Sequence, residues 1–180
     1  MNKIEQRQEI KSRLKSLENK DILSDKVYTN LISLNLLKGK VLIYNSINSE
    51  VSTNKLVEYY KNKVELFMPK VVGDDMVFIR VDENTKYSIG AFGIKEPIGK
   101  EYTKEEIDFD VCVTPLLGFD KNLNRLGKGK GYYDRFFENN NCLKIGLAFS
   151  CQEMDKIDTE ETDIKLDYIV TDLGVISESN

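Results

Sequence analysis

Runs of consecutive apolar residues recur along the chain, and each is too short to form a helix. Val41–Tyr44 is the clearest of them, and Phe109–Val113, which is apolar apart from Asp110, is a second strand candidate ended by Pro115. A continuous apolar run of this length is typical of a strand that is buried on both faces. Further strands are expected at residues 64–68 and 76–81, separated by Pro69 and the turn residues 73–75, and at residues 143–149 and 168–170.

Amphipathic segments fill the intervals between these runs. Apolar residues spaced three and four apart predict helices over residues 3–18 and 23–34, the second ending near Gly39. Strands that alternate with helices predict an α/β domain with a mostly parallel central sheet flanked by helices. With 180 residues, the chain is expected to form a single domain over residues 1–180. Further helices are expected to begin at residues 52–53 and near residue 132. The capping-box pattern of residues 103–106 predicts the start of another, brief helix.

A glycine-rich stretch lies between the expected strand at 109–113 and the expected helix at 132. Glycine occupies every second position at residues 127, 129 and 131, and Lys128 and Lys130 fill the positions between. Residues without a Cβ atom allow sharp bends, and neighbouring N–H groups can then turn inward as a nest for anions. The start of a helix adds a favourable dipole at the same place. In open α/β sheets, ligands bind beyond the carboxyl ends of the strands, where this stretch falls.

The charge of this region supports an anion site. Residues 121–135 contain five basic residues and one acid, a local charge of +4, whereas the whole chain carries −4. Such a cluster repels itself unless an anion lies within it, so the stretch predicts a polyphosphate site. A glycine-rich surface turn with solvated lysines is the alternative, but it does not explain why the cations converge.

The common phosphate motifs do not fit the stretch. A Walker loop needs a Ser or Thr after its lysine, and none occurs between Lys121 and Cys142. The dinucleotide fingerprint would need glycine at Tyr132 or Asp134. An RNA-binding signature begins at Lys130 but breaks after Tyr132.

The first helix carries two cations on its inward stripe. Ile10 and Leu14 form the apolar part of this stripe, and Arg7 and Lys3 continue it toward the N-terminus. Either the two cations lie on a frayed, solvated first turn, or they reach over the core edge toward an anion. The stripe alone favours neither interpretation.

Composition excludes several classes of protein. The chain has no histidine, which removes every histidine-based triad, zinc site and general base. Its three cysteines lack a metal-binding spacing and fit reduced thiols in a cytoplasmic protein. The net charge of −4 argues against a nucleic-acid coat or a polybasic membrane anchor. The first residues do not resemble a signal peptide, and the longest uncharged run, eleven residues from Val27 to Leu37, is far below the roughly 20 that span a bilayer.

A specific resemblance appears at the glycine-rich stretch. Phe119-Asp120, followed by Arg-Leu-Gly-Lys-Gly-Lys-Gly-Tyr-Tyr-Asp at residues 125–134, is similar to the signature Arg-Leu-Gly-x-Gly-x-Gly-Tyr-Tyr-Asp of the 5-formyltetrahydrofolate cyclo-ligase family, also called methenyltetrahydrofolate synthetases. The similarity covers nearly the entire chain. Other segments that match in the family's order are Lys3 and Arg7, Glu50 ahead of Thr53, residues 68–71, residues 93–97, and Asp163 with Asp167.

The resemblance implies a Rossmann-like α/β fold and an ATP-dependent ring closure. Members convert 5-formyltetrahydrofolate to 5,10-methenyltetrahydrofolate and release ADP and phosphate. The implied cofactors are ATP and Mg²⁺, and the implied partner is the folate substrate. We expect a cytoplasmic protein that binds neither nucleic acid nor membrane and is a monomer or weak homodimer.

The resemblance also implies roles for individual residues. Catalysis is assigned to Lys128, Lys130 and Arg125, and magnesium binding to Asp134 and Asp163. Of the two tyrosines, one is expected to pack and the other to face the ligand. Without the resemblance, Glu50 would be interpreted as a solvated loop carboxylate. The implied ATP contacts are Lys3, Arg7, Arg125, Leu126, Gly127, Lys128, Gly129, Lys130, Gly131, Tyr132 and Tyr133. The implied folate contacts are Asn45, Glu50, Lys128, Gly129, Lys130, Gly131 and Tyr132.

The chain departs from the family before the motif. Residues 114–119 read Thr-Pro-Leu-Leu-Gly-Phe, where Pro-Gly-x-Ala-Phe is more usual, so Leu116 is expected to alter the turn that approaches the loop. Asn45 lies in a variable part of the folate pocket. Two other classes of protein remain open: a non-catalytic nucleotide-binding or RNA-binding module that uses the basic loop, and a sugar-phosphate or acyl-transfer enzyme on a similar scaffold.

Overall fold

The computed structural model describes residues 1–90 and 93–178 and has the predicted α/β architecture. Its helices are α1 (Lys3–Ser16), α2 (Lys20–Leu34), α3 (Asn54–Tyr60), α4 (Tyr132–Glu138) and the short 3₁₀ helix η2 (Ser150–Gln152). Its strands are β1 (Lys40–Ile43), β2 (Glu65–Val72), β3 (Asp75–Val81), β4 (Lys86–Ile89), β5 (Lys95–Ile98), β6 (Glu101–Tyr102), β7 (Val111–Thr114), β8 (Gly118–Phe119), β9 (Arg125–Leu126), β10 (Leu143–Leu147), β11 (Tyr168–Thr171) and β12 (Gly174–Ser177).

A mostly parallel sheet forms the centre of the molecule. Within the described residues it has eight strands in the order β12-β11-β10-β7-β1-β2-β3-β6. The five strands from β11 to β2 are parallel to their neighbours, and β12, β3 and β6 add antiparallel edges. The short apolar runs of the sequence therefore become the inner strands, where both faces are buried. Two small antiparallel sheets, β4-β5 and β8-β9, lie outside it.

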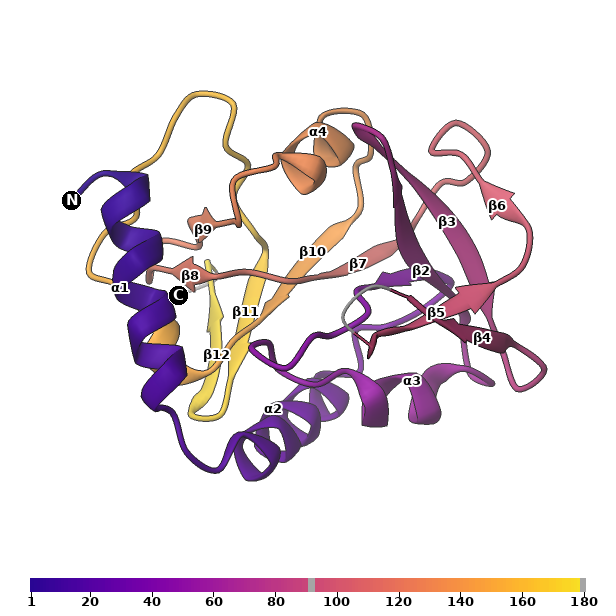
Figure 1. Cartoon of the computed structure of the whole chain (residues 1–180), viewed down its shortest axis with the longest axis horizontal. Coiled ribbons are helices and arrows are strands. Elements are labelled where there is room, and N and C mark those ends of the chain that lie inside the picture. Colours follow the sequence, from indigo (N-terminus) through magenta and orange to yellow (C-terminus); the bar gives the residue numbers. More distant parts are fainter. Residues whose placement is uncertain (91–92, 179–180) are drawn as a thin grey trace.

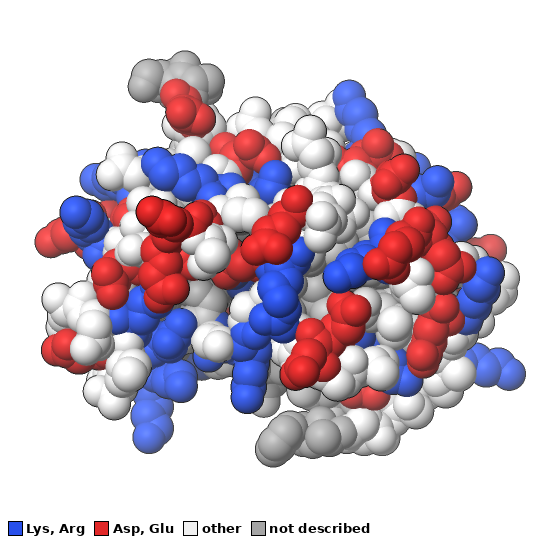
Figure 2. Space-filling view, turned by 90° about the horizontal axis from the view of Figure 1, so that it is seen from above, with Lys and Arg blue, Asp and Glu red and all other residues white. Residues whose placement is uncertain are grey.

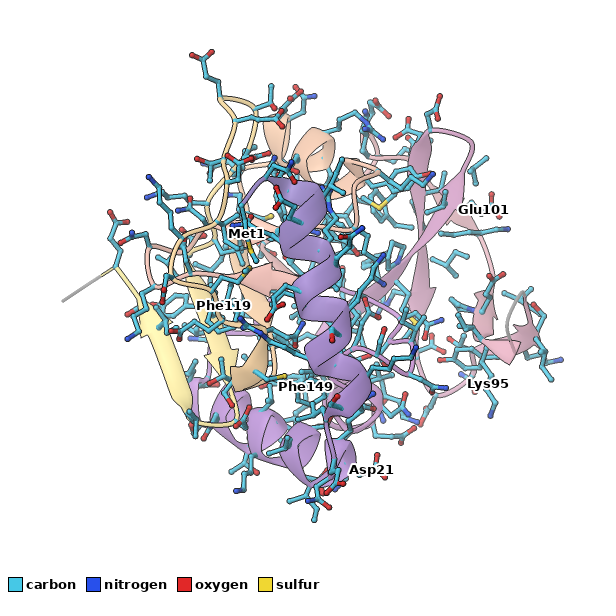
Figure 3. The ribbon with its side chains drawn as sticks, turned by 60° about the vertical axis from the view of Figure 1, so that its left-hand side comes forward. Met1, Asp21, Lys95, Glu101, Phe119 and Phe149 are labelled. Atoms are coloured by element: carbon cyan, nitrogen blue, oxygen red, sulfur yellow. The ribbon has the colours of Figure 1, made fainter. Side chains whose placement is uncertain are left out.

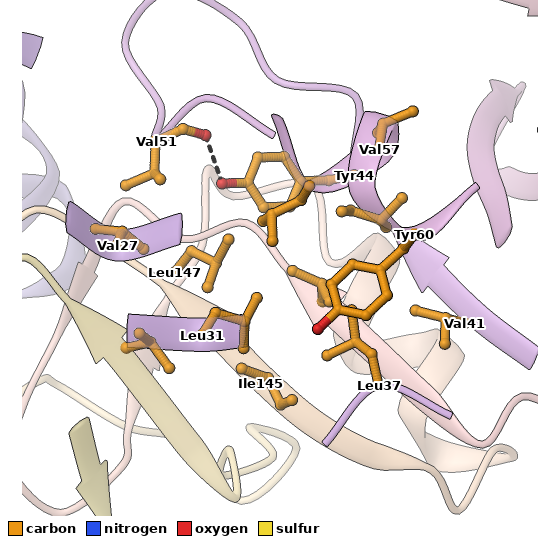
Figure 4. Packing of buried hydrophobic residues seen from close by; sticks show 14 of the residues in the cluster. Val27, Leu31, Leu37, Val41, Tyr44, Val51, Val57, Tyr60, Ile145 and Leu147 are labelled. Atoms are coloured by element: carbon orange, nitrogen blue, oxygen red, sulfur yellow. Dashed lines mark hydrogen bonds between the residues drawn. The ribbon is translucent and has the colours of Figure 1, made fainter. Parts of the chain in front are cut away.

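Helices cover both faces of the sheet (Figure 1). Alternate residues of β1 point to opposite faces, so Val41 and Ile43 join one apolar cluster and Leu42 joins the other. The first cluster packs α2 and α3 against the sheet, as the close view of Val27, Leu31 and their neighbours shows (Figure 4). The second packs α4 against the opposite face. The helix α1 lies at the end of the molecule beside β8, β9 and η2 (Figure 1).

Two predicted boundaries were wrong. The strand β2 continues through Pro69, which pairs in register with Phe78 of β3. Proline is tolerated there because the pairing of β1 with β2 ends at Phe67, and the rest of β2 is paired on one side only. The helix α2 ends at Leu34 rather than near Gly39, because Asn35 takes the left-handed conformation that closes a helix.

The expected helix after Thr103 is a single turn. The Glu106 carboxylate accepts hydrogen bonds from the N–H and the hydroxyl of Thr103, at 3.0 and 3.1 Å, so the capping pattern is present without a helix behind it. The β8-β9 hairpin was not predicted, because its strands have only two residues each. This hairpin leads directly into the glycine-rich stretch.

Candidate functional site

A cleft of about 880 Å³ lies beyond the carboxyl ends of the parallel strands. Glu50 reaches it from the loop after β1, and Pro115 and Leu116 reach it from the segment after β7. Residues 125–135 form one wall, the start of α1 forms a second, and residues 158–163 form a third. From above, Lys and Arg side chains run through the middle of this face between acidic groups (Figure 2). The position is that expected for a ligand site in an α/β sheet.

Two glycines of the stretch have backbone conformations that other residues rarely adopt. Gly129 has φ of +105°, and Gly131, which precedes α4, has φ of +72°. The Arg7 guanidinium donates from Nε to the Gly127 carbonyl at 2.9 Å, so α1 is joined directly to the loop. Of the two interpretations of the cationic stripe, the structure supports the one in which Arg7 reaches over the core edge.

Arg125 lies at the base of this wall with a side chain only 8% exposed. Its Nε donates to the Pro115 carbonyl at 2.8 Å, and its guanidinium lies 5.3 Å from the centre of the Tyr133 ring. Burial lowers the pKa of Arg125, and the negative charge of Asp134, whose Oδ2 is 4.0 Å from Nη1, acts against that shift. Arg125 remains a cation, because an arginine pKa starts far above neutral pH.

Lys128 and Glu50 form an ion pair that joins two parts of the chain. Lys128 Nζ donates to Glu50 Oε2 at 3.0 Å, and the other carboxylate oxygen accepts the Ile47 N–H at 2.8 Å. The Glu50 side chain is 8% exposed, whereas that of Lys128 is 46% exposed. Glu50 is therefore a buried, oriented carboxylate and not the solvated loop residue of the alternative interpretation.

Lys3 joins α1 to the third wall. Its Nζ lies 2.6 Å from Asp163 Oδ2 and 3.3 Å from Glu160 Oε1. Burial alone would lower the pKa of Lys3, but the bonds and charges of these two carboxylates outweigh it, and the pKa is raised. Lys3 is thus an ordered cation, 17% exposed, at the edge of the cleft.

Asp134, on the first turn of α4, faces the same wall. Its Oδ1 accepts the Ile164 N–H at 3.4 Å, and this bond joins the start of α4 to the residue that follows Asp163. Within residues 1–90 and 93–178, no three Asp, Glu or Cys side chains are grouped as a metal site. Two carboxylates beside a basic, glycine-rich loop nevertheless suit Mg²⁺, which usually takes one or two carboxylates, phosphate oxygens and water.

The two tyrosines differ in their surroundings. The Tyr133 ring packs beneath Arg125 and beside Phe137, and burial raises the pKa of its hydroxyl well above the ordinary value. The Tyr132 hydroxyl donates to the Gly73 carbonyl at 3.0 Å, at the tip of the β2-β3 hairpin. Both line the cleft, and which of them faces a ligand stays a prediction.

Not every predicted residue reaches the cleft. Asn45 does not line it, and its amide donates instead to the Lys95 carbonyl at 2.6 Å, which joins the loop after β1 to β5. Lys130 is exposed at the rim. Lys121, counted in the basic cluster, lies outside the cleft lining. Leu116, the departure from the family pattern, is 3% exposed and belongs to the second apolar cluster.

The sequence analysis assigned no role to three residues whose polar side chains are buried: Gln6, Gln152, and Asp120, which was named only as part of the signature. Gln152 donates to the carbonyls of Leu116 and Leu117, at 3.2 and 3.0 Å, and so holds the segment that was expected to be altered. Gln6 lies on the same helix face as Lys3, Ile10 and Leu14, so its spacing in the sequence could have predicted that it points inward. For Gln152 no signal existed, because its partners are backbone atoms distant in sequence.

The chain is similar to known proteins along most of its length. Residues 1–172 match the model of the 5-formyltetrahydrofolate cyclo-ligase family. The chain is 31% identical over 147 residues to a 5-formyltetrahydrofolate cyclo-ligase of Haemophilus influenzae, with 74% of this chain and 78% of that protein covered.

Two solved structures have a similar fold. An NMR structure of Aquifex aeolicus 5,10-methenyltetrahydrofolate synthetase is 34% identical with a TM-score of 0.84, covering 100% of this chain and 94% of that one. A 5,10-methenyltetrahydrofolate synthetase from Mycoplasma pneumoniae is 28% identical with a TM-score of 0.76, covering 96% and 99%. Among the described residues, no helix is long and apolar enough to cross a membrane.

Proposed function

Because the chain belongs to the 5-formyltetrahydrofolate cyclo-ligase family, we propose that the cleft beyond the strand ends is the site of an ATP-dependent ring closure. The enzyme is a ligase that converts 5-formyltetrahydrofolate to 5,10-methenyltetrahydrofolate. One observation carries the assignment to this cleft. The Lys128–Glu50 ion pair brings the glycine-rich anion loop and an oriented carboxylate to one place.

The chemistry explains why ATP is needed. The formyl group on nitrogen 5 is amide-like, and its oxygen would have to leave as hydroxide. Transfer of the γ-phosphoryl group of ATP to this oxygen gives an iminium phosphate. Nitrogen 10 then attacks the formyl carbon and loses its proton, and the oxygen leaves with phosphate. No covalent bond to the protein forms, so the enzyme acts by positioning and by neutralising charge.

On the nucleotide side, the chain offers cations from two directions. Lys3 and Arg7 from α1 and the backbone N–H groups of residues 127–131 suit the phosphate oxygens. Lys128 and Lys130 lie on either side of Gly129, where they would stabilise the charge of the phosphoryl group during transfer. Arg125, buried below them, supplies a fixed positive charge.

Magnesium fits the carboxylates at the edge of the cleft, where Asp134 of α4 meets the acidic wall of residues 158–163. Asp134, with Asp163 as a second ligand, would hold the ion against the phosphates, where it would neutralise their charge. When MgATP binds, Lys3 would leave Asp163 and pair with a phosphate oxygen. The pair would separate because phosphate would attract Lys3 and Mg²⁺ would attract Asp163.

On the folate side, Glu50 is the proposed recognition group. The pterin ring has a guanidine-like edge with two adjacent N–H donors, and a carboxylate accepts such a pair in bidentate fashion. The buried, oriented state of Glu50 supports this role, because the side chain is already held in place and loses little conformational entropy when it binds the pterin ring. Tyr132 and the backbone of residues 128–131 line the same cleft and are the other proposed folate contacts. A contact from Asn45 would require the loop after β1 to shift.

The test of the function is direct. Protein, MgATP and 5-formyltetrahydrofolate are mixed, and formation of the methenyl product is followed by its absorbance. Product with stoichiometric ADP is expected. A folded protein that binds ATP or RNA but releases no ADP when folate is added would support the non-catalytic module instead.

A further inference from the structure

Two buried polar side chains outside the cleft lining converge on residues 156–158. This segment leads into the acidic wall that carries Glu160 and Asp163. Gln6 is 3% exposed and Asp120 is 0% exposed. Together they bond three consecutive backbone groups of the segment: the Lys156 carbonyl, the Ile157 N–H and the Asp158 N–H.

Gln6 reaches the segment from α1. Its Nε2 donates to the Lys156 carbonyl at 2.7 Å, and its Oε1 accepts the Asp158 N–H at 3.0 Å. A side-chain amide that bonds the backbone in both directions fixes the helix and the segment at a defined distance. Gln6 lies between Lys3 and Arg7, the two cations that α1 brings to the cleft.

Asp120 reaches the same segment from the β8-β9 turn. Its Oδ1 accepts the N–H groups of Asn122 and Asn124, at 2.9 and 3.1 Å, and so closes the turn. Its Oδ2 accepts the Ile157 N–H at 2.9 Å and the Asn124 amide at 3.1 Å. The turn leads within one residue into Arg125 and then into the glycine-rich stretch.

Three walls of the cleft therefore meet at one buried point. The helix α1 crosses this side of the molecule, with Phe119, the residue before Asp120, close beside it (Figure 3). We propose that Gln6 and Asp120 are positioning residues, which set α1, the glycine-rich loop and the acidic wall at the separation that binds MgATP. The proposal rests on the proposed function, since it concerns the nucleotide side of the same cleft.

A purely structural role predicts a different result. In that case, loss of either residue lowers the melting temperature and changes all kinetic parameters together. A positioning role predicts a selective change, because the folate side is held separately by Glu50 and the loop after β1. The distinguishing quantity is the KM for MgATP relative to the KM for 5-formyltetrahydrofolate.

Asp120→Asn separates the two functions of this carboxylate. The remaining oxygen can still accept from Asn122 and Asn124, but the new amide N–H₂ would face the Ile157 N–H, donor against donor. The backbone hydrogen bonds of the turn are retained, and the link to the segment is lost together with the bond from the Asn124 side-chain amide. Asn124→Ala is the matched control, because it removes a bond to the same Oδ2 and leaves the link to Ile157 in place.

Gln6→Met removes both amide bonds at nearly constant length. The matched control is Asn30→Ala, which removes an amide bond from α2 to the Thr171 carbonyl, away from the cleft. We expect Gln6→Met and Asp120→Asn each to raise the KM for MgATP about tenfold or more, since small misplacements of binding groups cost this much. The KM for folate should change less than twofold, and both controls should stay near wild type.

A double variant tests the route of the effect. If Gln6 acts by placing Lys3 against the acidic wall, Gln6→Met should add little to the KM for MgATP once Lys3→Ala is present. Equal rises in both KM values, additive effects with Lys3→Ala, or a melting-temperature loss with unchanged KM would overturn the proposal. Wild-type protein that forms no methenyl product would instead overturn the function, so the two failures are distinguishable.

Discussion

At the scale of single residues, the ion pair between Lys128 and Glu50 links the two halves of the cleft. In the proposed function, the lysine binds phosphate and the carboxylate binds the pterin ring. Each ligand must therefore draw one member away from the other. The pair is half-exposed on the lysine side, so its strength is modest.

Glu50→Gln should strengthen nucleotide binding while it weakens folate binding. Without the carboxylate charge, Lys128 is available to phosphate, and a non-hydrolysable ATP analogue with Mg²⁺ should bind about two- to fivefold more tightly by calorimetry. Folate affinity should fall, because the amide cannot accept both pterin hydrogens. Glu138→Gln, at another carboxylate of the cleft lining, controls for charge alone. If it tightens nucleotide binding as much, the pairing argument fails.

Lys128→Ala and Asp134→Ala should reduce turnover about 100-fold or more, the usual effect of removing a group that stabilises charge in a transition state. Both side chains are partly exposed, so the melting temperatures of the two variants should stay within a few degrees of wild type. Lys121→Ala serves as the control, since it removes a cation of the same cluster outside the cleft lining. Full activity in either cleft variant would show that the site assignment is wrong.

At the scale of elements, the glycine-rich loop depends on backbone conformations. Gly129 and Gly73, at the tip of the β2-β3 hairpin, both have positive φ, +105° and +63°. A Cβ at Gly73 would have no atom within 4 Å, and one at Gly129 would meet the Arg7 guanidinium at 3.5 Å. Strain, not crowding, is therefore the main cost of alanine at either position.

Gly129→Ala and Gly73→Ala should each lower the free energy of unfolding by about 1 kcal/mol or more. Only Gly129→Ala should raise the KM for MgATP, because its backbone must change where phosphate binds. Urea unfolding and steady-state kinetics measure the two effects. A similar rise in KM for Gly73→Ala would indicate that the hairpin tip, through its bond to Tyr132, also shapes the site.

At the scale of the whole molecule, two buried tyrosine hydroxyls limit the stability of the folded state at high pH. Burial raises the pKa values of Tyr44 and Tyr133 well above the ordinary tyrosine value of 10.0. The folded state therefore holds these protons more tightly than the unfolded state does. Their contribution to stability is complete below pH 10 and is lost as the pH rises above it, because the unfolded chain then ionises first.

The free energy of unfolding should accordingly fall as the pH rises above about 10, the ordinary tyrosine pKa. Tyr44 is 3% exposed and donates to the Val51 carbonyl at 2.7 Å. Tyr44→Phe should cost about 1 kcal/mol at pH 7 through the lost hydrogen bond, and it should flatten the alkaline decline. Urea titrations at each pH give both values. An unchanged slope would assign the decline to other groups.

The fold was predictable because its signals are local. Val41–Tyr44 is apolar at every position, so it had to be an inner strand, and the amphipathic spacing of α1 and α2 required a surface against which to pack. The predictions that failed, at Pro69, Asn35 and Thr103, depend on the residues and strands that surround these positions. Whether a proline can stay in a strand is decided by the partner strand and not by the proline.

The sequence by itself determined the α/β class and the basic, glycine-rich character of residues 125–134, and it left open whether Lys3 and Arg7 reach over the core edge. These follow from residue type and spacing, which act over a few residues. Only the tertiary structure decided that Lys128 meets Glu50, that Asn45 lies outside the cleft wall, and that Gln6 and Asp120 join at residues 156–158. Such contacts join residues up to 152 positions apart, and hydrogen bonds to backbone atoms leave no mark on the partner's side chain.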